Sequence, residues 1–179
     1  LFVGMGHTDY TAADGLLLGH GDGTFTPATD RLAGNPKRRT NGCIACDYDN
    51  DGDVDLYVTN IGVNALLRND GNGKFTDVTT FSGTEDEGFS ACSAFGDLDG
   101  DGDLDLVVTK YLDVELITDR ECLNARSQRT YCNPTIYHAP MHDSLFVNNG
   151  DGTFTDATES SGFSKLKGTG LGVFISDLT

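Results

Sequence analysis

Two short segments of this chain concentrate aspartate at a spacing that suits a metal ion. Residues 47–55 read DYDNDGDVD and residues 97–105 read DLDGDGDLD, so both fit D-x-D-x-D-G-x-x-D. Carboxylates this close repel one another, and a cation between them removes the repulsion. Ca²⁺ suits such a loop because it accepts six to eight oxygen ligands in a flexible shell. The alternative, an acidic glycine-rich turn that binds nothing, is disfavoured by the recurrence of the pattern after 50 residues.

The positions within each loop predict separate roles for its aspartates. Positions one, three, five and nine are assigned as side-chain ligands, and position seven is assigned a backbone oxygen. Glycine at position six lets the chain turn back without a Cβ clash. The predicted ligands are Asp47, Asp49, Asp51, Asp53 (position seven) and Asp55 in the first loop, and Asp97, Asp99, Asp101, Asp103 (position seven) and Asp105 in the second.

The residues beside the loops indicate strands. An EF-hand begins in the same way, but it needs a bidentate Glu at position twelve and a helix on each side. Position twelve is Val58 in the first loop and Val108 in the second. The flanking runs 43–46 and 56–59 are short and apolar, as in strands. Each loop is therefore expected to connect two β-strands.

A second pattern occurs three times without gaps, at residues 15–34, 64–83 and 143–162. Each copy contains a short apolar strand, a glycine-rich turn, a phenylalanine and a further strand. Asp-Gly and Asn-Gly supply the positive φ that tight hairpins need. The phenylalanines are expected to pack between sheets, and the polar residue before each first strand is expected to cap the turn. These are Phe25, Phe75 and Phe154, and Asp14, Asn64 and Asp143.

The complete repeat contains four short antiparallel strands, and no helical periodicity persists, so the predicted class is all-β. A period near 50 residues with four-stranded sheets is typical of β-propeller blades. The run at 47–58, followed by N-x-L-x-x-N-x-G-x-G-x-F-T-D-V at 64–78, resembles the FG-GAP/VCBS repeats of integrin α-subunit propellers and many secreted bacterial proteins. The YCNP run at 131–134, leading to 145–154, is similar to the cartilage-acidic-protein (ASPIC/UnbV-associated) branch. The resemblance implies a Ca²⁺-binding extracellular propeller, but no particular ligand.

The repeat divides the chain into four parts. Residues 1–34 predict the last three strands of a blade, 40–83 and 88–162 predict two complete blades, and 168–179 predict the first strand of a further blade. Asp177 aligns with Asp47, so it is predicted to belong to a third Ca²⁺ site shared by the chain ends.

Propellers typically have four to eight blades, so these parts are not expected to close a ring alone. Two interpretations follow: a piece of a longer chain, or copies that associate head to tail by strand addition. In either case open sheet edges argue against a stable isolated monomer.

The cysteines predict one anchored insertion. The spacing between equivalent phenylalanines rises from 50 to 79 residues, which places an insertion at about 113–142. A loop of this length needs an anchor, and a disulfide between Cys122 and Cys132 would supply it. This pair of cysteines also matches the cysteine-rich insertion that the family resemblance implies. Cys43–Cys92 is the predicted second bridge, with Cys46 free, and zinc binding by the Cys43-x-x-Cys46 pair is the competing interpretation. Disulfides favour an extracellular or periplasmic location.

The remaining composition limits the function. The net charge is −16 with only 12 Lys and Arg, which disfavours a nucleic-acid partner. Residues 1–179 are expected to include neither a signal peptide nor an apolar run that could span a membrane, as in a mature form or a fragment of a secreted protein. It also lacks a G-x-S-x-G, P-loop or H-E-x-x-H motif. His138 and His142, separated by Pro140, are expected to be exposed residues of the insertion, and residues 85–87 are expected to form a solvated acidic loop.

We therefore predict a non-enzymatic extracellular Ca²⁺-binding propeller segment that acts in adhesion, scaffolding or head-to-tail assembly, with no catalytic residues. Its expected partners are other copies or the rest of a longer chain, and an extracellular protein or glycan ligand. The alternative is a secreted enzyme, or a propeller that binds carbohydrate or peptide, with its site on the 113–142 insertion.

Overall fold

Antiparallel strands dominate the computed structural model, which describes residues 2–3, 14–32, 39–113, 121–130, 132 and 139–176. Two sheets have four strands each, in the predicted order. One contains β4 (Thr40–Cys46), β5 (Asp55–Asn60), β6 (Ala65–Asn69) and β7 (Phe75–Asp77), and each of its strands pairs with the next in the chain. The other contains β8 (Ser90–Gly96), β9 (Asp105–Lys110), β13 (Ser144–Asn148) and β14 (Phe154–Asp156), and there β9 pairs with β13 across the insertion. The predicted all-β class with four-stranded blades is confirmed.

A further sheet precedes these two and has three strands among the described residues. It contains β1 (Phe2–Val3), β2 (Gly15–Gly19) and β3 (Phe25–Pro27), in that order. In chain order it is the first sheet, the β4–β7 sheet is the second, and the sheet of β8, β9, β13 and β14 is the third. The predicted hairpin pattern thus appears in all three sheets. The strand counterpart to β4 and β8 is not among the described residues of the first sheet.

The two complete sheets share their register as well as their order. Cys46 pairs with Asp55 where β4 meets β5, and Gly96 pairs with Asp105 where β8 meets β9. Both pairs of strands shift register two residues after the first strand begins, at Thr40/Gly42 and Ser90/Cys92. The acidic segments therefore connect equivalent strand ends, as predicted.

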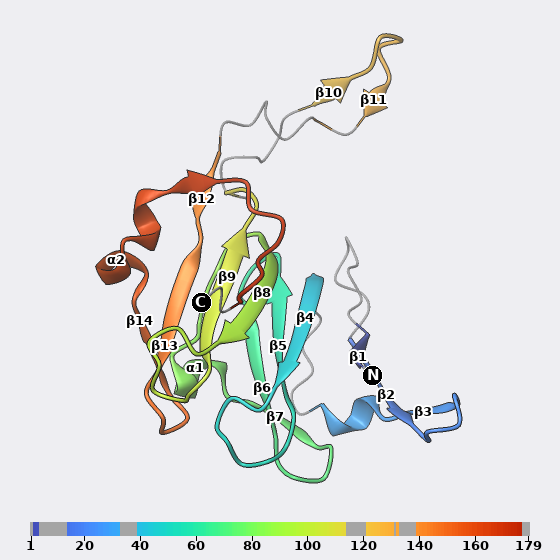
Figure 1. Cartoon of the computed structure of the whole chain (residues 1–179). Coiled ribbons are helices and arrows are strands. Elements are labelled where there is room, and N and C mark those ends of the chain that lie inside the picture. The colour runs from blue at the N-terminus through green and yellow to red at the C-terminus, as the bar shows by residue number, and fades with distance from the viewer. Residues whose placement is uncertain are drawn as a thin grey trace.

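The apolar core lies between the sheets rather than within one of them. Figure 1 shows the sheets side by side, with the β4–β7 sheet between its two neighbours. β5 is buried along its whole length because alternate side chains contact opposite neighbours. One cluster joins the first two sheets: Leu16, Ala28, Leu32, Leu56, Val58, Ala65, Leu67 and Phe75. The other joins the second and third: Tyr48, Tyr57, Leu66, Val78, Leu106, Val108, Phe146 and Phe154.

The repeated phenylalanines follow the prediction in two of three sheets. Phe75 and Phe154 are each 6 % exposed within these clusters. Phe25 is 51 % exposed, which corrects the expectation for the first copy. The reason is that a phenylalanine in this position faces the preceding sheet, and the described residues provide no sheet before β1.

Single-turn helices, which the repeat pattern did not predict, follow the last strand of each four-stranded sheet. They are α1 (Thr79–Ser82) and α2 (Thr158–Ser161). Asp77 Oδ1 accepts from the Thr79 N–H at 3.1 Å, and Asp156 Oδ1 accepts from the Thr158 N–H at 2.9 Å. A four-residue helix is too short to show a 3.6-residue apolar period, so local hydrogen bonds of this kind decide its formation. Short 3₁₀ turns, η1 (Thr29–Arg31) and η3 (Phe163–Lys165), occur in addition.

The insertion contains the predicted disulfide. Cys122 and Cys132 are bonded, with their Cα atoms 5.2 Å apart. The hairpin of β10 (Cys122–Leu123) and β11 (Arg129–Thr130) lies apart from the four-stranded sheets in Figure 1. The chain returns through β12 (Met141–His142), which pairs with β15 (Lys167–Gly168).

The predicted Cys43–Cys92 bridge is wrong, because Cys43, Cys46 and Cys92 are all free. Cys43 lies on the face of β4 that meets β2, as its shared cavity with Leu16 shows. Cys92 is three residues from Phe95, which packs toward β4, so alternation turns its sulfur to the far face of β8. Each thiol points away from the contact between the two strands.

Alternation also separates Cys43 from Cys46, because residues three apart in a strand lie on opposite faces. Cys46 packs in the cluster between the second and third sheets. The competing zinc interpretation therefore lacks a convergent pair of sulfurs.

The last described segment, residues 169–176, passes along the β8–β9 sheet. The Gly170 N–H donates to the Lys110 carbonyl at 3.0 Å. Residues 171–176 belong to no strand ladder of the described chain, so their predicted role as the first strand of a further blade stays a prediction. No helix within the described ranges is long and apolar enough to cross a membrane.

Candidate metal centre

The acidic loops turn in the way that their glycines allow. Gly52 and Gly102, at position six, have φ of 92° and 96°, a region that favours glycine. Asp47 accepts from the Asp51 and Gly52 N–H groups at 3.1 and 3.0 Å. Asp97 accepts from the Gly100 and Gly102 N–H groups at 2.7 and 3.1 Å, so the first carboxylate organises each turn.

The structure brings three predicted ligands together in each loop. One carboxylate oxygen from each residue lies within 4.8 Å of the others, in Asp47, Asp49 and Asp51 and in Asp97, Asp99 and Asp105. The predicted ligands Asp55 and Asp101 do not belong to these groups. Asp177 lies outside the described residues, so the third site shared by the chain ends stays a prediction.

The ninth position closes each loop against its own sheet. Asp55 and Asp105 are buried, and their carboxylates accept from backbone N–H groups on two sides. Asp55 accepts from Tyr48 at 3.2 Å and from Asn69 at 2.7 Å. Burial raises the pKa of Asp55 to about 6, the two N–H donors oppose this rise, and the charges of Asp49 and Asp51 add to it.

The asparagine that ends the third strand of each four-stranded sheet was not predicted as a site residue. Asn148 donates to the Leu104 carbonyl at 3.2 Å, and its N–H donates to Asp105 at 2.9 Å. It also donates to the Tyr48 carbonyl of the other loop at 2.9 Å. Asn69 repeats the first two contacts in its own sheet. The recurring N-x-G-x-G pattern could have predicted this role, because the side-chain amide of its asparagine hydrogen-bonds to both the acidic loop and the glycine turn.

The seventh aspartates point toward that glycine turn instead of the cluster. A Cβ on Gly150 would lie 2.7 Å from Asp103 Oδ2, so only glycine permits this approach. Asp103 also accepts from Asn50 Nδ2 at 2.7 Å, which links the loops of neighbouring sheets. Asn50 has φ of 58°, the left-handed region that Asn tolerates better than most residues. The side chain of Asp103 thus contacts Asn50 and Gly150, and its backbone carbonyl oxygen is the atom that could bind a metal ion in the loop.

One oxygen in the first loop fits a cation directly. Asp49 Oδ1 is buried and has no hydrogen-bond partner among the described residues. Burial and the adjacent Asp51 charge raise the pKa of this carboxyl. No ion pair between described residues involves a loop aspartate. An all-carboxylate set that lacks a cationic side chain suits a hard cation such as Ca²⁺.

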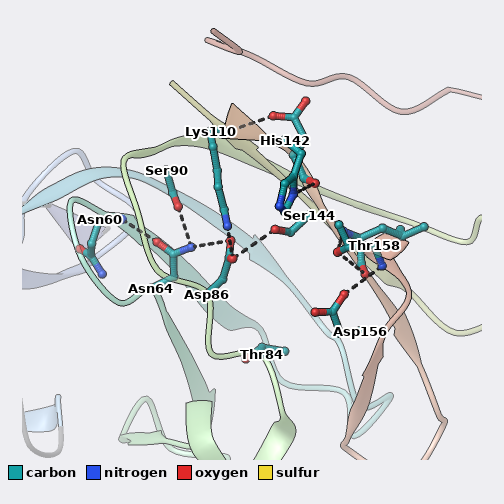
Figure 2. Close-up of polar contacts among 12 residues, drawn as sticks. Asn60, Asn64, Thr84, Asp86, Ser90, Lys110, His142, Ser144, Asp156 and Thr158 are labelled. Carbon is teal, nitrogen blue, oxygen red and sulfur yellow. Dashed lines mark hydrogen bonds and ion pairs between the residues drawn. The ribbon is translucent and has the colours of Figure 1, made fainter. Parts of the chain in front are cut away.

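The opposite end of the sheets carries a second polar group, which Figure 2 shows around Asp86. Asp86 Oδ1 lies 2.5 Å from Lys110 Nζ and accepts from Ser144 Oγ at 3.1 Å. Asn64 Nδ2 lies 3.4 Å from Asp86 Oδ2 and donates to Ser90 Oγ at 2.9 Å. Asp86 and Lys110 are 7 % and 6 % exposed in their side chains.

Glu85 and Glu87 are exposed, as expected for a solvated loop, but Asp86 is buried between two sheets, which corrects the expectation for that residue. The group supports the capping expectation for the polar residue before the third strand. Asn64 Oδ1 accepts from the Asn60 N–H at 2.9 Å, and Asp143 Oδ1 accepts from the Lys110 N–H at 2.9 Å. His142 lies beside this group (Figure 2) and is half-buried, which corrects its expected exposure, whereas His138 lies outside the described residues.

Comparison with known proteins supports the repeat that the sheets display. No curated protein matches the chain. Residues 1–58 and 47–108 each match a family described as FG-GAP-like repeat, so the matches together run from residue 1 to residue 108 of 179. The chain therefore belongs to the FG-GAP-like repeat family.

Proposed function

We propose that the protein is a non-enzymatic, calcium-stabilised propeller segment that acts as an extracellular scaffold in adhesion. The observation that carries this proposal is the buried, unpartnered Asp49 oxygen inside a cluster of carboxylates. Membership of the FG-GAP-like repeat family supports it, as does the occurrence of two acidic loops at equivalent strand ends.

Calcium would act through the architecture. It would neutralise loops in which Asp47, Asp49 and Asp51, or Asp97, Asp99 and Asp105, approach without a cationic partner. Asp55 and Asp101 complete the proposed side-chain ligands, and Asp53 and Asp103 contribute backbone oxygens. Because an unfolded chain has no such cage, binding energy becomes folding energy. The Cys122–Cys132 disulfide supports an oxidising, extracellular or periplasmic location.

The Asp51→Ala variant is expected to bind about one calcium ion fewer per chain than the wild type, because one cage loses a ligand. Isothermal titration calorimetry measures this stoichiometry. Asp151→Ala is the matched control, since it removes the same charge from an exposed turn where, among the described residues, Asp151 accepts from Thr153 alone. Equal stoichiometry in both variants would remove the first loop from the proposal.

A second candidate function places a ligand site on the insertion. The observation that favours it is the disulfide-anchored β10–β11 hairpin, which lies apart from the sheets (Figure 1). Replacing residues 121–132 with a short glycine linker is expected to leave calcium stoichiometry unchanged. If the same variant loses binding on an extracellular glycan or protein array, the insertion carries the recognition and the sheets serve as its support.

A further inference from the structure

The two acidic loops are hydrogen-bonded to each other, although they belong to neighbouring sheets. Asn50, at position four of the first loop, donates from Nδ2 to Asp103 Oδ1 in the second loop at 2.7 Å. A second link comes from the third sheet, where Asn148 Nδ2 donates to the Tyr48 carbonyl of the first loop at 2.9 Å. The two proposed metal loops therefore form one connected polar unit.

In the first loop, both links end next to proposed metal ligands. Tyr48 lies between Asp47 and Asp49, and Asn50 lies between Asp49 and Asp51. These three aspartates are the ones whose carboxylate oxygens approach one another in this loop. The backbone that positions the three carboxylates is therefore the same backbone that the links attach to the second loop.

In the second loop, the links end on proposed ligands and their immediate supports. Asp103 is the residue proposed to contribute its backbone carbonyl oxygen, and its side chain accepts from Asn50. The Asn148 N–H donates to Asp105 Oδ1 at 2.9 Å, and Asp105 belongs to the carboxylate group of this loop. Each link thus connects a ligand position of the second loop with a residue between ligands of the first.

Asn50 is the residue that distinguishes the first loop from the second in this respect. Its φ of 58° lies in the left-handed region, which most side chains avoid. Position four of the second loop is Gly100, with φ of 82°, so glycine can make the same turn without a side chain. Among the described residues, the Asn50 side chain hydrogen-bonds to Asp103 alone. The asparagine therefore serves the contact between loops rather than the turn.

Ordering and charge have opposite effects on the binding of a second ion. The entropy cost of ordering the shared contacts falls on the first ion, which favours the second. The first ion also reduces the negative charge that attracts the second, but a loop of five aspartates stays negative with one Ca²⁺ bound. At physiological ionic strength, this unfavourable effect is largely screened between exposed charges more than about 8 Å apart. The ordering effect is therefore expected to prevail.

We propose that the two acidic loops bind calcium cooperatively, and that Asn50 carries the coupling between them. This cooperativity rests on the proposed function, since it requires both loops to bind calcium. Occupation of either loop raises the affinity of the other by the same factor, because coupling between binding free energies is reciprocal. The junction of the second and third sheets then responds to calcium as one unit.

A thermodynamic cycle measured by isothermal titration calorimetry tests the coupling. Asp51→Ala leaves the second loop to bind calcium, and Asp99→Ala leaves the first. The coupling factor is the product of the two wild-type association constants divided by the product of the two single-loop constants. A factor of about 5–10 is expected, at the lower end of the usual range for coupled sites. A factor of one or less would overturn the proposal.

The role of Asn50 is tested by the same cycle in an Asn50→Gly background, where the coupling factor is expected to fall at least about 3-fold. Glycine suits this position, as Gly100 shows in the second loop, so the fold and the calcium stoichiometry should not change. Asn72→Gly is the matched control, because Asn72 lies in an exposed turn where its side chain accepts from the Lys74 N–H. If the two variants have equal coupling factors, Asn50 does not connect the sites.

The titrations also separate this proposal from the one on which it rests. If the wild type binds no calcium, both the metal sites and their coupling are wrong. If both loops bind calcium with a coupling factor of one, the metal sites are correct and the cooperativity alone is wrong. Circular dichroism of each variant checks that a lost coupling does not reflect a lost fold.

Discussion

Removing calcium with excess EGTA is expected to lower the melting temperature of the protein by roughly 10–20 °C. Two sites held near 100 times their dissociation constant contribute about 5 kcal/mol, and a domain of this size loses about 2–4 °C for each kcal/mol. The physical cause is repulsion within each loop, where carboxylate oxygens lie within 4.8 Å of one another. Differential scanning calorimetry measures the shift, and restoring Ca²⁺ should reverse it.

A charge-reducing variant separates loop repulsion from a general effect of the chelator. Asp49→Asn with Asp99→Asn is expected to abolish the response to EGTA. It is also expected to raise the melting temperature of the calcium-free protein, because each loop then has one fewer repelling charge. If EGTA leaves the wild-type melt unchanged, the acidic loops are turns that fold without an ion.

The Lys110→Met variant is expected to lose about 3–5 kcal/mol of unfolding free energy, the usual cost of leaving one member of a buried ion pair uncompensated. Asp86 would keep its place between two sheets, with Ser144 and Asn64 as its remaining side-chain partners. Denaturant unfolding, followed by circular dichroism, measures the loss. The exposed pair of Arg68 and Asp70 gives the control, since Arg68→Met is expected to cost less than about 1 kcal/mol.

The same variant should have a distinctive pH dependence. Burial raises the pKa of Asp86, and in the native chain Lys110 opposes that rise. When the pKa of a carboxyl is higher in the folded state than in the unfolded state, the carboxyl does not destabilise the fold at pH below its unfolded pKa. The free energy of unfolding then falls as pH rises through the folded pKa. The defect of Lys110→Met should therefore shrink in acid.

Replacing both partners, Lys110→Met with Asp86→Asn, should recover part of the loss at neutral pH. If Lys110→Met alone is as stable as the wild type, the ion pair of Lys110 and Asp86 contributes little to the contact between the sheets.

The sequence was sufficient to predict the features that form within a single repeat unit. The strand order, the loop ends at Asp55 and Asp105, and the turning glycines all follow from local patterns that recur at a fixed spacing. The Cys122–Cys132 bridge was also accessible, because two cysteines close in sequence lie in one insertion. These features depend on residues that are close in sequence, and their recurrence in successive repeats makes them easier to recognise.

The tertiary structure decided which side of each strand meets which neighbour. The Cys43–Cys92 expectation failed because spacing gives the alternation of side chains but not the sheet that each face meets. For the same reason residues 85–87 read as a solvated loop, although Asp86 is buried against Lys110 of the next sheet. By itself the sequence determined the repeat and its acidic loops. Only packing between sheets determined the burial of Asp86, because burial depends on residues far apart in the chain.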